Sequence, residues 1–294
     1  MAIVCAISVG NIYFVQPLLG NIARSLGVSF HDVSYLPMWT QAGTALGMFS
    51  FVPLGDMLPR RGLIVTMCLA ISVCGMMMAL APGLGLASVA AFATGLTAIV
   101  PHLILPFAAK LTPTSARGHV LGTIMSGLLA GILLARVFSG FIGEALGWRA
   151  VYWIASALMV LLALWVRVGL PVDDPEGRIG YFDVLRSLVH LTRTQPVLRA
   201  AALTGALTFG AFSSFWATLV FLLSTPPYHY GARVAGMFGL VGAAGAIAAP
   251  RVGRLADRKG TAFAAAVAIL LVIAGWLTFL VAGHWLAGLA VGII

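Results

Sequence analysis

The sequence predicts an all-α polytopic membrane protein with two bundles of transmembrane helices, the second of them incomplete. Of its 294 residues, 61% are hydrophobic and only 9% are charged. A soluble domain carries about a quarter charged residues, so this chain has too few to cover a water-facing surface. Apolar runs of about 20 residues, the length that crosses a bilayer as a helix, recur along the chain. A charged hairpin around Asp56 returns in related form around Asp257.

The apolar runs are expected to form nine membrane-spanning helices and the beginning of a tenth. Pro17 is expected to end or kink the first of them. In chain order the predicted spans are residues 3–23, 35–54, 63–81, 86–109, 120–143, 150–170, 200–223, 234–250 and 262–282, and the tenth begins near Trp285.

The repeat indicates how long a complete two-bundle chain would be. The two hairpin aspartates are 201 positions apart (257 minus 56). Two repeats of that length need about 400 residues. Two or three spans of the second bundle are therefore expected to be missing from this sequence.

A change in composition between the sixth and seventh spans predicts a linker. Residues 173–178 are a polar turn cluster, and the segment after it carries Phe182, Leu185, Leu188 and Val189 at helical spacing. That spacing is typical of an amphipathic helix on the membrane surface. The predicted organisation is a six-helix transmembrane bundle in residues 1–170, a cytoplasmic linker in 171–199 and a partial second bundle in 200–294.

The basic residues predict the orientation of the chain. If the N-terminus is cytoplasmic, thirteen of the 17 Lys and Arg residues lie in inside loops or at inside helix ends, whereas outside loops hold Arg24, Arg149 and Arg233. The positive-inside rule then places both charged hairpins in the cytoplasm, with the bacterial cytoplasmic membrane as the expected location. Basic residues dispersed in this way explain the net charge of +9 without a nucleic-acid partner.

The sequence offers little support for enzyme chemistry. The three cysteines lie in apolar runs with no His or carboxylate at ligand spacing, so we expect no metal, cofactor or disulfide. A remote alternative is an intramembrane hydrolase with Ser126 or Ser139 as nucleophile and His102 as base. Neither serine lies in a Gly-x-Ser-x-Gly motif, and no span contains an acid that could orient the histidine.

The two hairpins carry the residues that we assign to a cytoplasmic latch. An aspartate at a helix end, beside arginines on a short loop, can bridge to a neighbouring helix and hold one packing arrangement. The alternative for the basic residues is that they only set topology, but acidic residues contribute little to topology. The predicted latch residues are Asp56, Arg60, Arg61, Gly253, Asp257, Arg258 and Gly260.

Small residues in the fifth span indicate close helix packing. They recur every fourth position, a pattern that lets helix backbones approach each other in lipid. Either static packing or sliding of helices would use such a face. The predicted packing residues are Gly127, Gly131, Ala135 and Ser139, which have this spacing, and Gly140 next to Ser139.

Polar and aromatic residues within the spans are candidates for a substrate cavity. Arg136 is the most informative, because a charge inside a span usually faces the bundle interior; snorkelling to the outer interface is the alternative. His102 is the deepest titratable candidate for proton coupling, and a buried structural histidine is the favoured alternative. The cavity candidates are Asn11, Tyr13, Gln16, Trp39, Gln41, His102, Arg136, Phe215 and Trp216.

These motifs resemble the major facilitator superfamily, in particular its drug:proton antiporter-like exporters. The family's hairpin signature is matched by Asp56 and by the pair Arg60 and Arg61, with Val52, Met57 and Pro59 as departures. In the second copy the four predicted latch residues match, whereas Thr261 and Ala262 replace the basic pair. The span-five signature of antiporters is similar to residues 131–140, in which Arg136 stands where that signature has proline.

The resemblance implies a six-plus-six helical fold and a secondary transporter that works by alternating access. It further implies a monomer that exports a small amphipathic molecule in exchange for protons, as in multidrug resistance. An uncoupled facilitator or metabolite carrier, and a truncated inactive transporter, are the alternatives.

Overall fold

A computed structural model of the protein describes residues 1–173, 180–224, 228–242, 261–282 and 285–293. Within these ranges all regular secondary structure is helical. Six helical segments among the described residues are long and apolar enough to cross a membrane. The predicted all-α, polytopic fold class is therefore confirmed.

The helices follow the predicted apolar runs closely. In chain order they are α1 (Ala2–Tyr13), α2 (Val15–Leu26), α3 (Phe30–Val33), α4 (Tyr35–Phe51), η1 (Val52–Asp56), α5 (Arg60–Ala79), α6 (Leu84–Thr97), α7 (Val100–Leu111), α8 (Arg117–Ala145), α9 (Trp148–Gly169), α10 (Tyr181–Thr194), α11 (Pro196–Ser224), α13 (Thr261–Ala282) and α14 (Leu286–Ile293). A shorter apolar helix covers Ala232–Gly242.

Two of the predicted spans are each divided into two α-helices, and prolines explain both breaks. The first span is divided at Phe14. Pro17 has no N–H to donate to the carbonyl of Tyr13, so the helix cannot continue regularly there. The fourth span is divided before Pro101, which cannot donate to the carbonyl of Thr97. The predicted effect of Pro17 is thus confirmed, whereas the break in the fourth span was not predicted.

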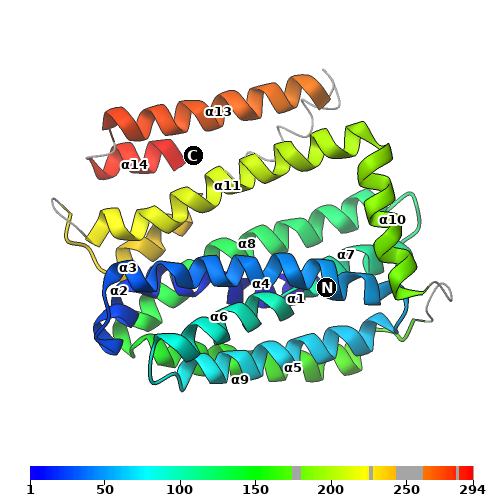
Figure 1. Ribbon diagram of the computed structural model, residues 1–294, viewed down its shortest axis with the longest axis horizontal. Coiled ribbons are helices and arrows are strands. Elements are labelled where there is room, and N and C mark those ends of the chain that lie inside the picture. Colours follow the sequence, from blue (N-terminus) through cyan, green and yellow to red (C-terminus); the bar gives the residue numbers. More distant parts are fainter. Residues whose placement is uncertain (174–179, 225–227, 243–260, 283–284, 294) are drawn as a thin grey trace.

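Helices α1 to α9 form one body, which occupies the lower part of Figure 1. Its principal helix pairs are α4 with α6, α5 with α9 and α1 with α8. Glycine makes the first of these contacts possible, because a Cβ added to Gly95 would fall on the carbonyl oxygen of Thr40. This body positions the buried face of α8, on which the candidate site is built.

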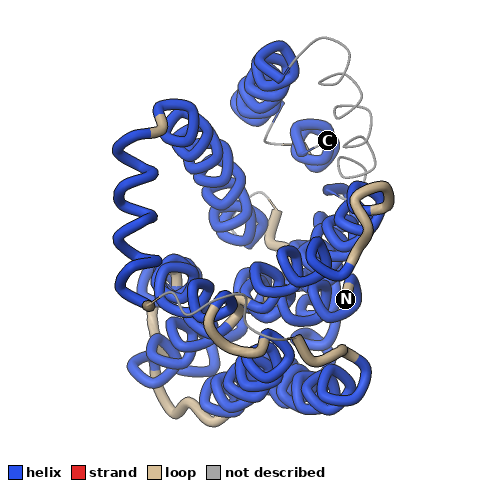
Figure 2. Tube along the Cα trace, turned by 90° about the vertical axis from the view of Figure 1, so that its right-hand side faces the viewer, coloured by secondary structure: helices blue, strands red, loops and turns tan. Residues whose placement is uncertain are grey.

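The remaining helices begin with α10, which runs steeply across one end of the body (Figure 1). No residue of α10 is buried, and Phe182 on its apolar face is 81% exposed. The hydroxyl of Tyr181 donates to the carbonyl of Ser50 at 3.0 Å and ties this helix to the body. Helix α11 then crosses back to contact α2, and α13 and α14 lie beside each other on its far side (Figures 1 and 2).

Candidate functional site

The site begins with Arg136, in the second half of α8. Its side chain is buried, with only 1% exposed. Nε donates to the amide oxygen of Gln16 on α2 at 3.0 Å, and Nη1 donates to the carbonyl of Ile132 at 2.9 Å. The sequence left open whether Arg136 faces the bundle interior or extends to the outer interface. The structure places its guanidinium in the interior of the protein.

Aromatic rings enclose this guanidinium. The Cζ atom of Arg136 lies 4.6 Å from the ring centroid of Tyr13, 4.1 Å from that of Trp216 and 5.6 Å from that of Phe212. Such distances give favourable cation–π interactions, which strengthen where water is excluded. Tyr13 is on α1, whereas Trp216 and Phe212 are on α11, so one buried charge connects the body to the helix after the linker. We call Arg136, Gln16, Tyr13, Phe212 and Trp216 the arginine cluster.

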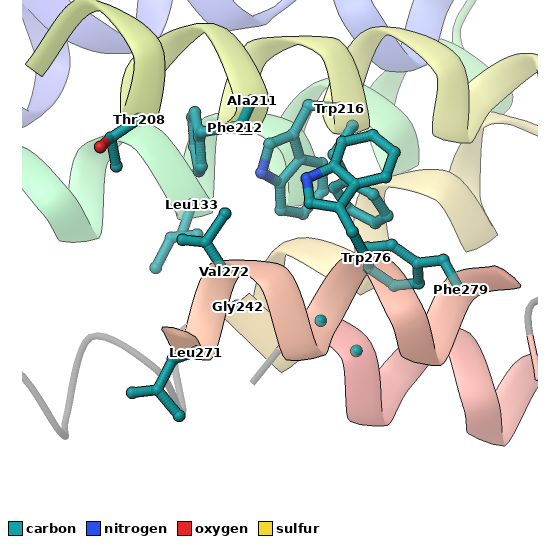
Figure 3. A pocket seen from close by; sticks show the side chains of 13 residues that line it. Leu133, Thr208, Ala211, Phe212, Trp216, Gly242, Leu271, Val272, Trp276 and Phe279 are labelled. Atoms are coloured by element: carbon teal, nitrogen blue, oxygen red, sulfur yellow. The ribbon is translucent and has the colours of Figure 1, made fainter. Parts of the chain in front are cut away.

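A cavity of about 300 Å³ adjoins the arginine cluster. Phe212 and Trp216 belong to both, since they approach the guanidinium and also line the cavity. Figure 3 shows these rings on α11 facing Trp276 and Phe279 on α13. Phe215, also in the lining, stacks on Phe279 with ring centroids 4.6 Å apart. Five of the thirteen residues that line the cavity are therefore aromatic.

Small residues bring α8 close to helices on two sides. On one side, Gly127 and Gly131 pack against Ala2 and Ala6 of α1. Ala135 is buried beside Gly10 in the same contact.

On the other side, α8 packs against the helix Ala232–Gly242. A Cβ added to Gly140 would lie 2.6 Å from the carbonyl oxygen of Ala232, and one added to Gly239 would lie 2.7 Å from that of Leu133. Ser139 is fully buried, and its hydroxyl donates to the carbonyl of Arg136 at 3.3 Å. The contact that Gly140 makes thus lies one helical turn from Arg136.

The structure brings some of the predicted cavity residues together and separates others. Tyr13, Gln16, Arg136 and Trp216 meet in the arginine cluster, and Phe215 lines the adjoining cavity. Phe212 was missed, although it lies four residues before Trp216 and so shares its helix face. Trp276 and Phe279 were missed as well, because nothing in the sequence of that span marks one face of its helix.

The other predicted cavity residues lie elsewhere. Asn11 donates to the carbonyl of Ile7 and lines a small gap within the body. Trp39 is 47% exposed and packs edge-on against Phe92. Gln41 and His102 are half-buried, and Nδ1 of His102 has no hydrogen-bond partner among the described residues. These four residues share no contact with the arginine cluster among the interactions of the described residues.

The first charged hairpin forms a compact ionic cluster at the start of α5. Arg60, which is 5% exposed, pairs with Asp56 at 3.0 Å and lies 3.8 Å from the carboxylate of Asp173. Asp173 also accepts the backbone N–H of Arg60 at 2.8 Å, and Arg61 donates to the carbonyl of Leu170 at 3.3 Å. Asp173 was expected only as part of a turn, yet it connects the hairpin to the segment that follows α9.

The second copy of the hairpin signature lies outside the described residues, and its residues are Gly253, Asp257, Arg258 and Gly260. Within the part of the chain that the structure describes, no three His, Cys, Asp or Glu side chains gather in a way that could hold a metal ion.

Comparisons with known proteins agree with this architecture. A family profile described as Major Facilitator Superfamily matches residues 1–294. The "Putative uncharacterized transporter YgaY" of Escherichia coli K12 is 39% identical over all of this chain, which spans 75% of that protein. The "Chloramphenicol resistance protein" of Streptomyces lividans is 28% identical over 93% of this chain and 69% of its own length.

Among solved structures, a similar fold is found in a bacterial homologue of the human lysosomal transporter Spinster, in an inward-facing, occupied conformation. The TM-score is 0.75, with 16% sequence identity over 99% of this chain and 68% of the other. At that identity the likeness concerns the fold alone.

Proposed function

Since this chain belongs to the major facilitator superfamily, we propose that it is a secondary transporter of small amphipathic molecules that works by alternating access. The observation that carries the proposal is the arginine cluster, in which a buried charge on α8 contacts α1, α2 and α11 beside a cavity. A site held jointly by helices before and after the linker changes its surroundings when the two sets of helices move. We propose that the chain consists of a six-helix transmembrane bundle (residues 1–170), a cytoplasmic linker (171–199) and a partial second bundle (200–294).

The cavity supports a small amphipathic substrate. Its volume of about 300 Å³ is at the lower end of the range that binds small molecules. The wall is mostly apolar and includes five aromatic side chains, and the charge of Arg136 lies directly behind two of them, Phe212 and Trp216. An apolar wall with a few polar groups is typical of a ligand site that fixes orientation through those groups.

The proposed motion uses two further features. The close contact of α8 with Ala232–Gly242 places small residues where the two halves would slide. The cluster of Asp56, Arg60 and Asp173 would hold the cytoplasmic end of the body in one arrangement, as the first half of the latch. Gly253, Asp257, Arg258 and Gly260 are proposed as its counterpart in the second half.

We further propose that transport is proton-coupled export from the cytoplasm, by a monomer whose N-terminus lies inside the bacterial cytoplasmic membrane. The resemblance of the chain to drug:proton antiporter-like exporters supports the direction and the coupling, and His102 is the proposed proton-binding group. Similarity to a protein named for chloramphenicol resistance also favours export. The positive-inside rule supports the orientation.

The test is transport by the protein as its cell makes it, reconstituted into liposomes with an imposed pH gradient. We expect fluorescent amphipathic compounds to accumulate against their gradient, and an uncoupler to abolish the accumulation. Equilibration that is independent of the pH gradient would indicate the uncoupled facilitator instead. If no cationic, neutral or anionic compound moves, the proposal is wrong.

A further inference from the structure

The arginine cluster contains a buried positive charge for which the described residues supply no counter-charge. The ion pairs among those residues are His31 with Asp32, Arg60 with Asp56 and Arg60 with Asp173, and none of them includes Arg136. Removing a charge from water is costly unless an opposite charge and hydrogen bonds compensate for it. Cation–π contacts and two neutral oxygen acceptors, on Gln16 and Ile132, compensate for only part of that cost.

The hydrogen bonds of this guanidinium are also incomplete. An arginine has five N–H donors in a planar fork. Here Nε and Nη1 have acceptors in Gln16 and Ile132, whereas Nη2 has none among the described residues. The free donors therefore lie on the edge formed by Nη1 and Nη2. That edge matches the two oxygens of a carboxylate, which arginine binds through two parallel hydrogen bonds.

The surroundings of this edge restrict what else the anion can carry. Phe212 and Trp216 approach the guanidinium and also line the cavity, whereas Arg136 itself is not in the lining. A shift of these two rings would expose the charge to the cavity and would leave the apolar wall to hold the rest of the ligand. A dianion would bring an excess negative charge into this apolar site, where a single arginine could not neutralise it.

From these observations we propose that Arg136 is the anion-binding group of the transport site, and that the substrate is a small organic monoanion, a carboxylate on an aromatic or bulky apolar body. This rests on the transport function proposed above and names the class of molecule carried. The negative charge of the substrate completes the neutralisation of Arg136, and the aromatic rings of α11 and α13 hold its apolar body.

The first experiment compares two ligands of nearly the same shape that differ in charge. Binding of 1-naphthoate and of uncharged 1-naphthamide to the detergent-purified, full-length native protein is measured by isothermal titration calorimetry. We expect naphthoate to bind about tenfold more tightly or better, the size of a charge-assisted hydrogen-bonded contact. Acetate, which has the charge without the apolar body, is expected to bind at least about tenfold more weakly than naphthoate. Equal binding of naphthoate and naphthamide would show that the site does not select a negative charge. Equal binding of acetate and naphthoate would show that it does not select an apolar body. Either result would overturn the proposal.

Variants then test which residue binds the carboxylate of naphthoate. Arg136→Gln should remove the preference for naphthoate over naphthamide, and Arg136→Lys should retain it in weaker form. The matched control is Arg186→Gln, which removes the same charge from the exposed surface of α10 and should leave the preference unchanged. A preference that survives in Arg136→Gln would contradict the proposal.

Gln16→Glu keeps the arginine and tests the same point if Arg136→Gln does not fold. The new carboxylate would replace an amide oxygen 3.0 Å from Nε and would neutralise the guanidinium from within the protein. We expect naphthoate affinity to fall at least about tenfold, with a melting temperature equal to or above that of the wild type. Undiminished naphthoate binding by Gln16→Glu would overturn the proposal.

The outcomes separate the two proposals. If naphthoate binds with the expected dependence on Arg136 and Gln16 but liposomes move no compound, the anion site stands and the transport function fails. If liposomes move uncharged amphipathic compounds and Gln16→Glu leaves binding unchanged, transport stands and the anion site fails.

Discussion

The guanidinium carbon of Arg136 lies 4.1 Å from the ring centroid of Trp216, although the two residues belong to α8 and α11 on opposite sides of the linker. Arg136 is also hydrogen-bonded to Gln16 on α2. The same buried charge therefore contacts helices before and after the linker of the proposed transporter. A motion that separates the two parts has to change the surroundings of this charge.

The first prediction concerns the ring over the guanidinium. Trp216→Leu removes a buried aromatic side chain together with its cation–π contact, and the loss is expected to cost about 3 kcal/mol of stability. Thermal unfolding in detergent should show a clearly lower melting temperature. The matched control is Trp39→Leu, since Trp39 is partly exposed, and it should change the melting temperature much less. Similar effects of the two substitutions would argue against a special role for Trp216.

The second prediction concerns the contact between α8 and Ala232–Gly242. Gly140→Ala would place a methyl group 2.6 Å from the carbonyl oxygen of Ala232, so the helices would have to separate locally. We expect transport to fall at least about tenfold, in keeping with the cost of overpacking, while the protein still inserts into the membrane.

Gly122→Ala on the same helix is the control for this substitution. A Cβ at Gly122 meets no atom within 4 Å. Alanine stabilises a helix by about 1 kcal/mol relative to glycine. This variant should transport normally and be slightly more stable. Normal transport by Gly140→Ala would show that the close contact is not needed for function.

The third prediction separates the two carboxylates around Arg60. Asp173→Asn weakens a buried pair and the acceptor of the Arg60 backbone N–H, so it should destabilise the fold by about 1–3 kcal/mol. The side chain of Asp56 is 63% exposed, and Asp56→Asn should cost less than about 1 kcal/mol. If the hairpin is a latch, Asp56→Asn will nevertheless impair transport. Wild-type transport by a well-inserted Asp56→Asn protein would remove the latch assignment.

The fourth prediction concerns orientation. Ser187 lies on exposed α10 and Ser25 at the end of α2, on opposite sides of the membrane if the N-terminus is inside. A membrane-impermeant thiol reagent applied to intact cells should label Ser25→Cys, and it should label Ser187→Cys only after the membrane is opened. The native cysteines Cys5, Cys68 and Cys74 are buried, which keeps the background low. Labelling of Ser187→Cys in intact cells would reverse the topology.

The sequence predicted most of the fold because membrane helices follow from local composition. Apolar runs and flanking charges gave the spans, and Pro17 marked the break between α1 and α2. The site was less predictable, because its members come from different helices and meet only through packing. Nothing in the local sequence shows that Gln16 accepts a hydrogen bond from Arg136, 120 positions away. The carboxylate of Asp173 was missed for the same reason, since it meets Arg60 across 113 positions.

The most direct test of the central claim, that the cavity beside the arginine cluster is alternately accessible from the two sides, uses one cysteine. Ala211 lines the cavity near the middle of α11 (Figure 3). In reconstituted Ala211→Cys protein, the labelling rate by an impermeant reagent is measured from each side of the membrane, with and without naphthoate. Alternating access requires labelling from both sides, at rates that naphthoate changes. Labelling from one side only, at a rate that naphthoate leaves unchanged, would contradict it.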